Sequence, residues 1–123
     1  MEELLLVTNN SLIKDGDFSL RIQRVEGDFS SVLEAAKHLI YTGHELYTHP
    51  LPASIKMFLS PSWSIILRQP KQKGVTPMAS AQLVEEAIDQ YDHILGQRQS
   101  DWQRQADYEL IDRDLVKESL ALA

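Results

Sequence analysis

Residues 28–48 carry the pattern that decides the fold, DFSSVLEAAKHLIYTGHELYT. Asp28 can cap the start of a helix, and Gly43 stands where a left-handed residue would end it. Apolar residues recur between them at helical spacing, at Phe29, Val32, Leu33, Ala36, Leu39 and Ile40. The segment from Glu45 to Thr48 then predicts a strand. Because the order strand, helix, strand favours a right-handed crossover between parallel strands, we expect this helix to pack on a sheet.

Three further strands are predicted around this unit. Leu4 to Val7 is a continuous apolar run that fits a buried central strand, and near-alternating apolar residues indicate a strand from Phe18 to about Val25. Ser64 to Arg68 is the fourth, with one proline before it and another after it. The sequence therefore predicts an α/β fold with a mainly parallel sheet of about four strands.

The second half of the chain has helical patterning. A helix is predicted with Thr76 as its cap, Pro77 at its first position and its end near Gly96. Beyond this helix the composition becomes polar and charged, but apolar residues still recur on one helical face, at Tyr108, Ile111, Leu115 and Leu122. We predict one α/β domain over residues 1–97 and a helical C-terminal tail over residues 98–123.

Length and composition exclude several classes of protein. With 123 residues and 43% hydrophobic content, the chain is long enough for one domain with a core. Its net charge of −6 disfavours general nucleic-acid binding, and the lack of cysteine excludes disulfides, thiolate nucleophiles and Cys-based metal sites. No run of about 18 apolar residues fits a membrane span. The acidic start, Met1 to Glu3, is unlike a secretory signal, so we expect a cytoplasmic protein without membrane contact.

The segment from Gly43 to Lys56 concentrates polar and proline residues and is the best place to look for a site. Open α/β sheets bind ligands beyond the carboxyl ends of their strands. Side chains there are the ligand-binding candidates, namely Asn9, Asn10, Glu26, Thr48, His49, Ser54 and Lys56. A structural alternative stays open, in which Asn9 and Asn10 are turn residues and His49 begins a turn with its imidazole bonded to backbone.

Several kinds of chemistry lack the residues that they need. His44 and His49 are five positions apart, which places them on opposite faces of a regular strand, so no metal site is predicted. Ser54, His49 and Asp28 can be combined into a triad, but no Gly-x-Ser-x-Gly motif supports a hydrolase. Neither Gly-x-Gly-x-x-Gly nor a P-loop is present, and we predict no cofactor.

A series of short motifs spans roughly residues 3 to 95. They are Val7-Thr8-Asn9-Asn10, Val25-Glu26-Gly27, Gly43-His44, Leu46, Thr48-His49-Pro50-Leu51, Ser54-Ile55-Lys56, Ser60-Pro61 and Ser64-Ile65-Ile66. In these motifs the chain resembles the GrdX family, small proteins associated with the glycine, sarcosine and betaine reductase systems of amino-acid-fermenting anaerobes. The resemblance implies a biological setting and assigns no catalytic residue.

Two functions follow as hypotheses. The resemblance implies a non-enzymatic accessory protein of an amino-acid reductase system, which binds a reductase-system protein or a small anionic ligand. The alternative is a small enzyme, or a carboxylate- or phosphate-binding protein, that uses His49, Ser54 and Lys56. The resemblance favours binding over catalysis, and the residues themselves decide neither. The apolar stripe of the tail needs a cover, and a second copy of the chain is the simplest one, so a homodimer is predicted. The alternative, in which the tail folds back onto the sheet of its own chain, stays open.

Overall fold

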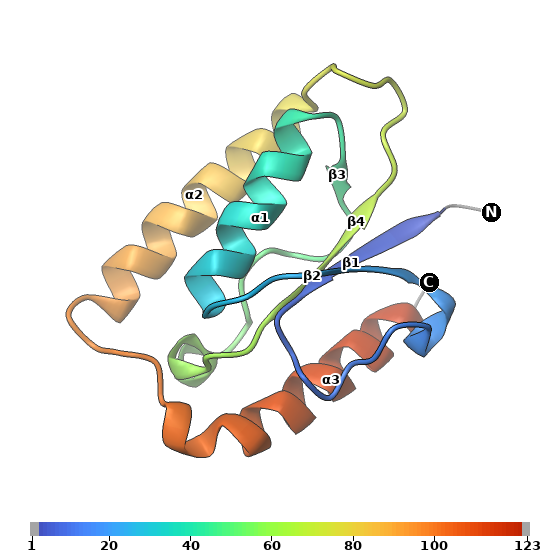
Figure 1. Ribbon diagram of the computed structural model, residues 1–123. Helices are drawn as coiled ribbons and strands as arrows, with labels where there is room; N and C mark the ends of the chain where they lie inside the picture. The colour runs from blue at the N-terminus through green and yellow to red at the C-terminus, as the bar shows by residue number, and fades with distance from the viewer. Residues whose placement is uncertain (1–2, 122–123) are drawn as a thin grey trace.

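A computed structural model describes residues 3–121 of the chain. The main elements are β1 (Leu4–Thr8), β2 (Arg21–Arg24), α1 (Phe29–Tyr41), β3 (Glu45–Leu46), β4 (Ser64–Arg68), α2 (Met78–Leu95) and α3 (Gln105–Ala121). Short 3-10 helices lie between them, η1 (Asp17–Ser19), η2 (Ile55–Leu59) and η3 (Trp102–Arg104). In Figure 1, α1 and α2 lie side by side, and α3 lies apart from them across the sheet. The predicted α/β class is confirmed.

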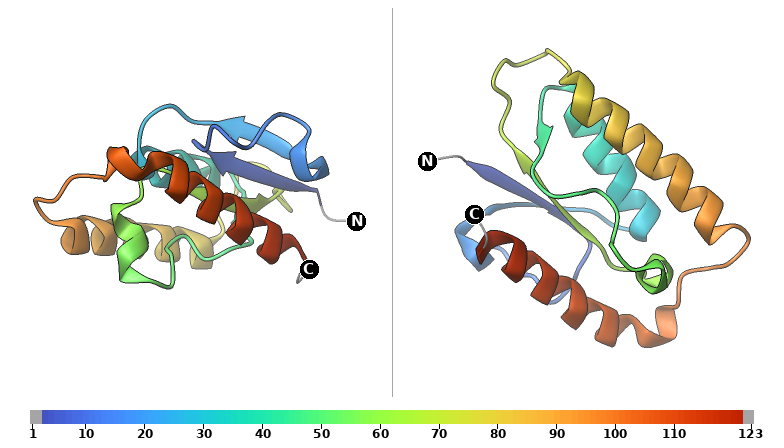
Figure 2. Two further views of the ribbon diagram at one scale, coloured as in Figure 1. Left: turned by 90° about the horizontal axis from the view of Figure 1, so that it is seen from below. Right: turned by 180° about the vertical axis from the view of Figure 1, so that it is seen from behind.

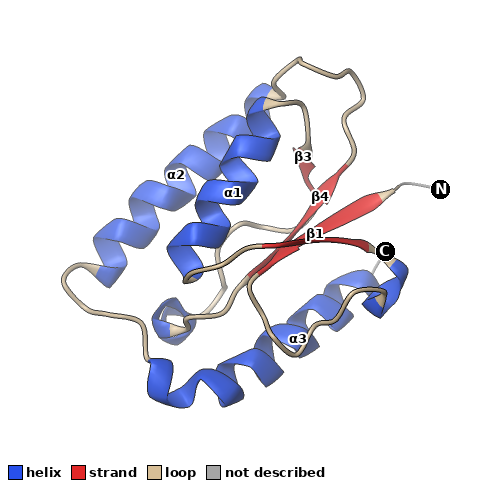
Figure 3. Ribbon diagram, viewed as in Figure 1, coloured by secondary structure: helices blue, strands red, loops and turns tan. Residues whose placement is uncertain are grey.

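The sheet is mixed, so the prediction of a mainly parallel sheet was wrong. Its strand order is β2-β1-β4-β3, with β1 parallel to β2 and β4 antiparallel to both of its neighbours. The reason lies in residues 47–63, which form loops and η2 rather than a crossover helix (Figure 3). The chain therefore enters β4 at the same end of the sheet at which it left β3, so the two strands run antiparallel. β2 and β3 run in the same direction, but β1 and β4 lie between them.

Alternate residues of the central strands supply two separate cores. Val7, Ile65 and Leu67 face α1 and α2, while Leu6 and Ile66 face α3. On the α1 and α2 side the ring of Phe29 stacks on Trp63 at 5.0 Å and on Tyr91 at 4.5 Å. Figure 2 shows the same three layers from two other directions. The period-2 alternation of a strand is what allows one sheet to carry helices on both faces.

α1 begins and ends where the sequence predicts. The Asp28 side chain accepts a hydrogen bond from the Ser31 amide at 3.2 Å, which caps the helix start. Gly43 has φ +120°, and a Cβ there would lie 3.1 Å from the Pro70 side chain and 3.2 Å from the Gln72 carbonyl. A glycine is therefore required both by the backbone angle and by the close approach of the next turn.

Three predicted boundaries differ from the structure. The second strand begins at Arg21 rather than at Phe18, because Phe18 and Ser19 have φ values of +60° and +56° inside a tight turn. The third strand stops at Leu46, where the chain bends into the loop that leads to β4. α2 begins at Met78 with a proline as its cap, and the hydroxyl of Thr76 instead donates to the Tyr41 carbonyl. Local patterning identified these elements but not their ends.

The predicted C-terminal helix is present as α3, and it packs on the sheet of its own chain. Its buried residues are Glu109, Asp112 and Val116, whereas Ile111 is 44% exposed and Leu115 is 37% exposed. Leu122 lies outside the described residues. The homodimer stays a prediction, for which Ile111 and Leu115 leave an apolar surface. No helix within residues 3–121 is long and apolar enough to cross a membrane.

Candidate functional site

The carboxyl ends of β1, β2 and β3 and the amino end of β4 lie at the same end of the sheet. The register pairs Thr8, the last residue of β1, with Ser64, the first residue of β4. Both side chains are buried. Polar residues from the starts and ends of these strands are thus brought together beneath α3. This end of the sheet is the candidate site.

A chain of hydrogen bonds links this end of the sheet to α3. The Ser64 hydroxyl donates to Oδ2 of Asp112 at 2.6 Å and lies 2.7 Å from the Thr8 hydroxyl. The Asn10 side-chain amide donates to the same carboxyl oxygen at 2.9 Å, and the Asn10 backbone amide donates to the Thr8 hydroxyl at 3.0 Å. Four buried side chains, Thr8, Asn10, Ser64 and Asp112, therefore form one polar cluster.

Glu109 joins α3 to the loop that follows β1. Its carboxylate accepts the Ser11 backbone amide at 2.7 Å and the Ser11 hydroxyl at 2.8 Å. Its backbone carbonyl accepts the Asn10 side-chain amide at 2.8 Å. Two successive inward-facing residues of α3 are thus acidic and hydrogen-bonded, because a buried carboxyl without partners would be strongly unfavourable.

Burial raises the pKa of Asp112 from 3.8 to about 6. The hydrogen bonds from Ser64 and Asn10 oppose this rise by favouring the ionised carboxylate, and the negative charge of Glu109 adds to it. Asp112 therefore exchanges its proton closer to neutrality than an exposed aspartate does. A carboxyl of this kind, placed at the wall of a cavity, is a candidate functional group.

A cavity of about 190 Å³ opens between α3 and the loop that follows β3. Its apolar wall consists of Leu51, Pro52, Ala53, Trp63, Ile66, Leu115 and Val116. Its polar wall consists of Thr48, His49, Ser64, Asp112 and Ser119. A small, mainly apolar cavity with a few polar groups is the usual form of a small-molecule site.

Two of the predicted residues, Thr48 and His49, line this cavity. The Thr48 hydroxyl accepts the Ile66 backbone amide at 3.0 Å, which leaves its hydrogen free to be donated. Nδ1 of His49 lies 3.1 Å from the Leu51 amide, which donates to it, and 3.2 Å from the Leu51 carbonyl. The proposed backbone bonding of His49 is therefore present, and Nε2 is the ring nitrogen available to a ligand.

Glu26, Ser54 and Lys56 do not line the cavity. Glu26 is exposed in the connection between β2 and α1, and Ser54 is exposed at the start of η2. Lys56 lies in a separate groove between η2 and α2. Ser54 therefore does not share this cavity with Thr48 and His49, and a ligand-binding role for Ser54 stays a prediction.

Asn9 and Asn10 act as connectors in the folded chain. The Asn9 amide donates to the Pro61 carbonyl at 2.7 Å and to the Gly27 carbonyl at 3.0 Å, and its side-chain oxygen accepts the Trp63 amide at 2.9 Å. Asn10 is fully buried and contacts Asp112 and Glu109. Both asparagines thus hold loops together around the site. The structural alternative describes these contacts, and a ligand-binding role for either stays a prediction.

Sequence reasoning missed Asp112, Glu109 and Ser64. The prediction of a helical tail rested on its apolar residues, and neither acidic residue was a site candidate. The spacing of Glu109, Asp112 and Val116, at three and four positions, was the signal available. This spacing places the three residues on one helical face, but it does not by itself indicate that the face is buried.

The geometry supports recognition more than nucleophilic chemistry. The Ser64 hydroxyl donates directly to Asp112, and Nδ1 of His49 is engaged with its own loop, so these residues form no serine–histidine relay. Within residues 3–121, no three His, Cys, Asp or Glu side chains gather in a group that could hold a metal ion. The cavity instead offers a carboxyl and several hydroxyls beside an apolar wall.

Comparison with known proteins places the chain in a family. Neither a curated protein nor a solved structure matches it. One family model, described as GrdX-like protein, matches residues 5–121. The match continues through α3 instead of ending near residue 95, so the helix that carries Glu109 and Asp112 is part of the family's sequence pattern. The chain therefore belongs to the GrdX-like protein family.

Proposed function

We propose that this protein is a non-enzymatic accessory protein of an amino-acid reductase system, of the glycine or betaine type, and that it binds a small molecule in the cavity beneath α3. The reductase setting is supported by membership of the GrdX-like family and by what the resemblance implies. Ligand binding is supported by the cavity between α3 and the loop after β3. The protein would hold or sense a metabolite for its partner system.

The observation that carries ligand binding is the position of Asp112. This carboxyl is 1% exposed, yet it belongs to the cavity wall. Its two side-chain donors, Ser64 and Asn10, both bond to Oδ2. A carboxyl that is held in this way recognises a group that donates hydrogen bonds, such as an amine or ammonium group. A cavity of about 190 Å³ has room for a molecule of only a few heavy atoms.

The opposite end of such a ligand would meet the loop after β3. The Thr48 hydroxyl hydrogen and Nε2 of His49 are the donor groups that this loop offers. A small amino acid presents an ammonium group at one end and a carboxylate at the other, so it matches both sides of the cavity. A simple anion matches only one side and would face the Asp112 carboxylate.

The alternative is an anion site that uses His49, Ser54 and Lys56. It would need the loop after β3 to bring these side chains together, whereas Lys56 lines a groove beside α2. We therefore favour the cavity and an amine-bearing ligand. The two possibilities predict opposite ligand preferences, which makes them separable in one titration.

The test is a titration of the ¹⁵N-labelled protein with methylammonium, glycine, acetate and phosphate, followed by NMR. We expect methylammonium and glycine to shift the amides of Thr48, Ser64 and Asp112 in a saturable way, with glycine recovered unchanged. Ser119→Trp, which fills the cavity, should abolish these shifts. Glu118→Trp is the matched control, because it adds the same side chain at an exposed neighbouring position.

Two outcomes would contradict the proposal. Saturable shifts with acetate or phosphate at Ser54 and Lys56, and none with glycine, would favour the anion site. Equal binding by the Ser119→Trp and Glu118→Trp variants would place the ligand elsewhere. The reductase setting is tested separately, by asking whether reductase subunits copurify with the tagged protein from cells that make both.

A further inference from the structure

A second concave surface lies away from the cavity, where η2 meets the end of α2. It is a groove of about 140 Å³ lined by Ile55, Lys56, Phe58, Leu59, Ile94, Leu95 and Arg98. Its floor is apolar, and Phe58 at the bottom belongs to the aromatic core. None of these residues lines the cavity beneath α3, so the groove is an independent feature.

Two basic side chains line the rim of the groove, Lys56 from η2 and Arg98 from the segment after α2. Both residues are exposed. In the part of the chain that the structure describes, neither side chain forms a hydrogen bond or an ion pair. The nearby Asp101, whose backbone amide bonds to the Leu59 carbonyl, is instead 3.8 Å from Arg104. This positive rim occurs on a chain with a net charge of −6.

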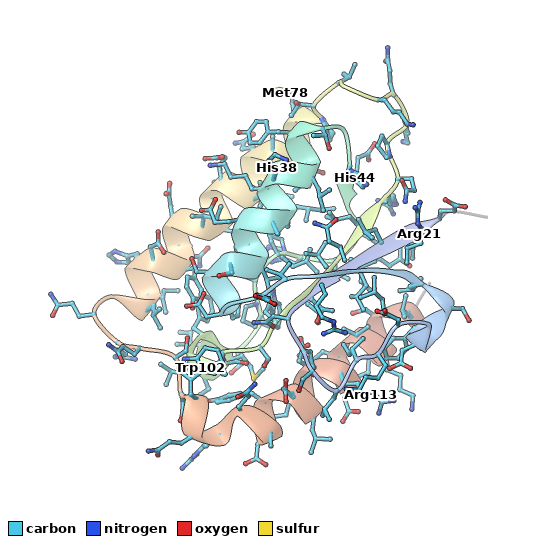
Figure 4. All side chains as sticks on the ribbon, viewed as in Figure 1. Arg21, His38, His44, Met78, Trp102 and Arg113 are labelled. Carbon is cyan, nitrogen blue, oxygen red and sulfur yellow. The ribbon has the colours of Figure 1, made fainter. Side chains whose placement is uncertain are left out.

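Large apolar side chains are exposed in the groove and near it. Ile55 is 67% exposed, and Trp102 is 50% exposed. Trp102, labelled in Figure 4, directly follows Asp101, whose backbone amide donates to the carbonyl of Leu59 at the end of η2. Exposed apolar residues that are contiguous and surrounded by charges mark interaction sites, and tryptophan and arginine are the residues that most often dominate their binding energy.

We propose that this groove docks a segment of a partner protein in which a large apolar side chain is flanked by Asp or Glu. The apolar side chain would enter between Ile55 and Leu95, and the carboxylates would pair with Lys56 and Arg98. Charge complementarity selects this occupant, because the two basic side chains on the rim can pair with the carboxylates of such a segment. The inference is independent of the ligand in the cavity.

The test uses fluorescence anisotropy with three labelled peptides that differ in a single respect. The first has two leucines between pairs of glutamates, the second has lysine in place of each glutamate, and the third has alanine in place of each leucine. We expect the first peptide to bind at least tenfold more tightly than the other two. Added salt should weaken its binding, because the exposed pairs are screened.

Variants then locate the binding site. Lys56→Glu combined with Arg98→Glu should lower the affinity for the glutamate peptide at least tenfold. The matched control is Lys117→Glu combined with Arg113→Glu, which reverses two exposed charges on α3 and should leave binding within twofold. Far-UV circular dichroism and the unfolding midpoint establish that both variants are folded, and the exposed positions make this the expected result.

Three results would overturn the proposal. One is failure of the glutamate peptide to bind more tightly than its lysine and alanine counterparts. Another is equal loss of binding in both double variants, which would reflect net charge alone. The third is saturable binding of the protein to vesicles of anionic phospholipid, lost in Lys56→Glu combined with Arg98→Glu, without any peptide binding, because the basic rim would then serve a membrane surface.

Discussion

On the face of the sheet covered by α1 and α2 the packing is aromatic and aliphatic, whereas on the face covered by α3 a hydrogen-bonded polar cluster occupies the contact. Phe29 stacks between Trp63 and Tyr91 on the first face. On the second face Asp112 and Glu109 are buried beside Val116, the one buried apolar residue of α3 in the described chain. The first arrangement gives stability through burial, and the second gives specific geometry at the cost of desolvating charge. The candidate site lies on the second face.

The largest effect is expected from damage to the aromatic face. Phe29→Ala removes the central ring of the stack and leaves a cavity between α1 and the sheet. We expect a loss of about 3–5 kcal/mol of unfolding free energy, measured by urea denaturation. The chain should lose both faces in one transition. A loss below about 1 kcal/mol, the usual cost of a point substitution, would show that this stack is not the main source of stability.

The pH dependence of stability should come from the α3 face. The pKa of Asp112 is about 6 in the folded protein, compared with the ordinary value of 3.8 expected in the unfolded chain, so folding favours the protonated form. Its stabilising contribution is therefore complete below about pH 4 and is lost as the pH rises through about 6. This contribution of Asp112 to the free energy of unfolding is about 3 kcal/mol, since one pKa unit corresponds to about 1.4 kcal/mol. The comparison of wild type with Asp112→Asn, over pH 4 to about 8, isolates this group, and identical profiles would contradict its assignment.

A smaller effect is expected from removing the acceptor altogether. Asp112→Ala leaves Ser64 and Asn10 without their buried acceptor, which should lower the unfolding free energy by about 1–3 kcal/mol at pH 5. Asp112→Asn keeps an acceptor oxygen in place and should lose less. Urea denaturation of the two variants at one pH gives the difference. Equal losses would mean that the hydrogen bonds to Asp112 contribute little.

The smallest effect on stability is expected at His49. This residue is exposed, and its ring nitrogen contacts only the backbone of its own loop. His49→Ala should change the unfolding free energy by less than about 1 kcal/mol while weakening glycine binding in the cavity. A loss of several kcal/mol would identify His49 as an anchor of the loop. Unchanged glycine binding would remove it from the proposed site.

The sequence predicted the bounds of α1 better than the direction of β4. The helix α1 was predicted at both ends, because Asp28, the apolar period and Gly43 are all local signals. The direction of β4 was not predictable in the same way, because it depends on the path of residues 47–63. No local pattern indicates at which end of the sheet a loop leads into the next strand. The strand itself was identified, while its partners were not.

The candidate site shows the same division between local and distant information. Thr48 and His49 were found because they follow a predicted strand, which is a local signal. Asp112 was missed because its surroundings depend on a contact with Asn10, 102 positions earlier in the chain. A polar residue in a charged tail gives little sign of burial until the tail is placed on the sheet. Asn10 was selected for the right location, and its bonds to α3 could not be foreseen.

The central claim is that the Asp112 cluster holds α3 over the cavity, on the less stable of the two faces of the sheet. Residue-resolved amide hydrogen exchange tests it most directly, with rates corrected for the intrinsic effect of pH and compared at about pH 5 and pH 7.5, on either side of the pKa of Asp112. We predict that α3 opens at lower free energy than α1 at both pH values, and that the opening free energy of α3 falls at the higher pH in wild type but not in Asp112→Asn. Exchange of α3 and α1 at one common free energy, unchanged by pH, would contradict the claim.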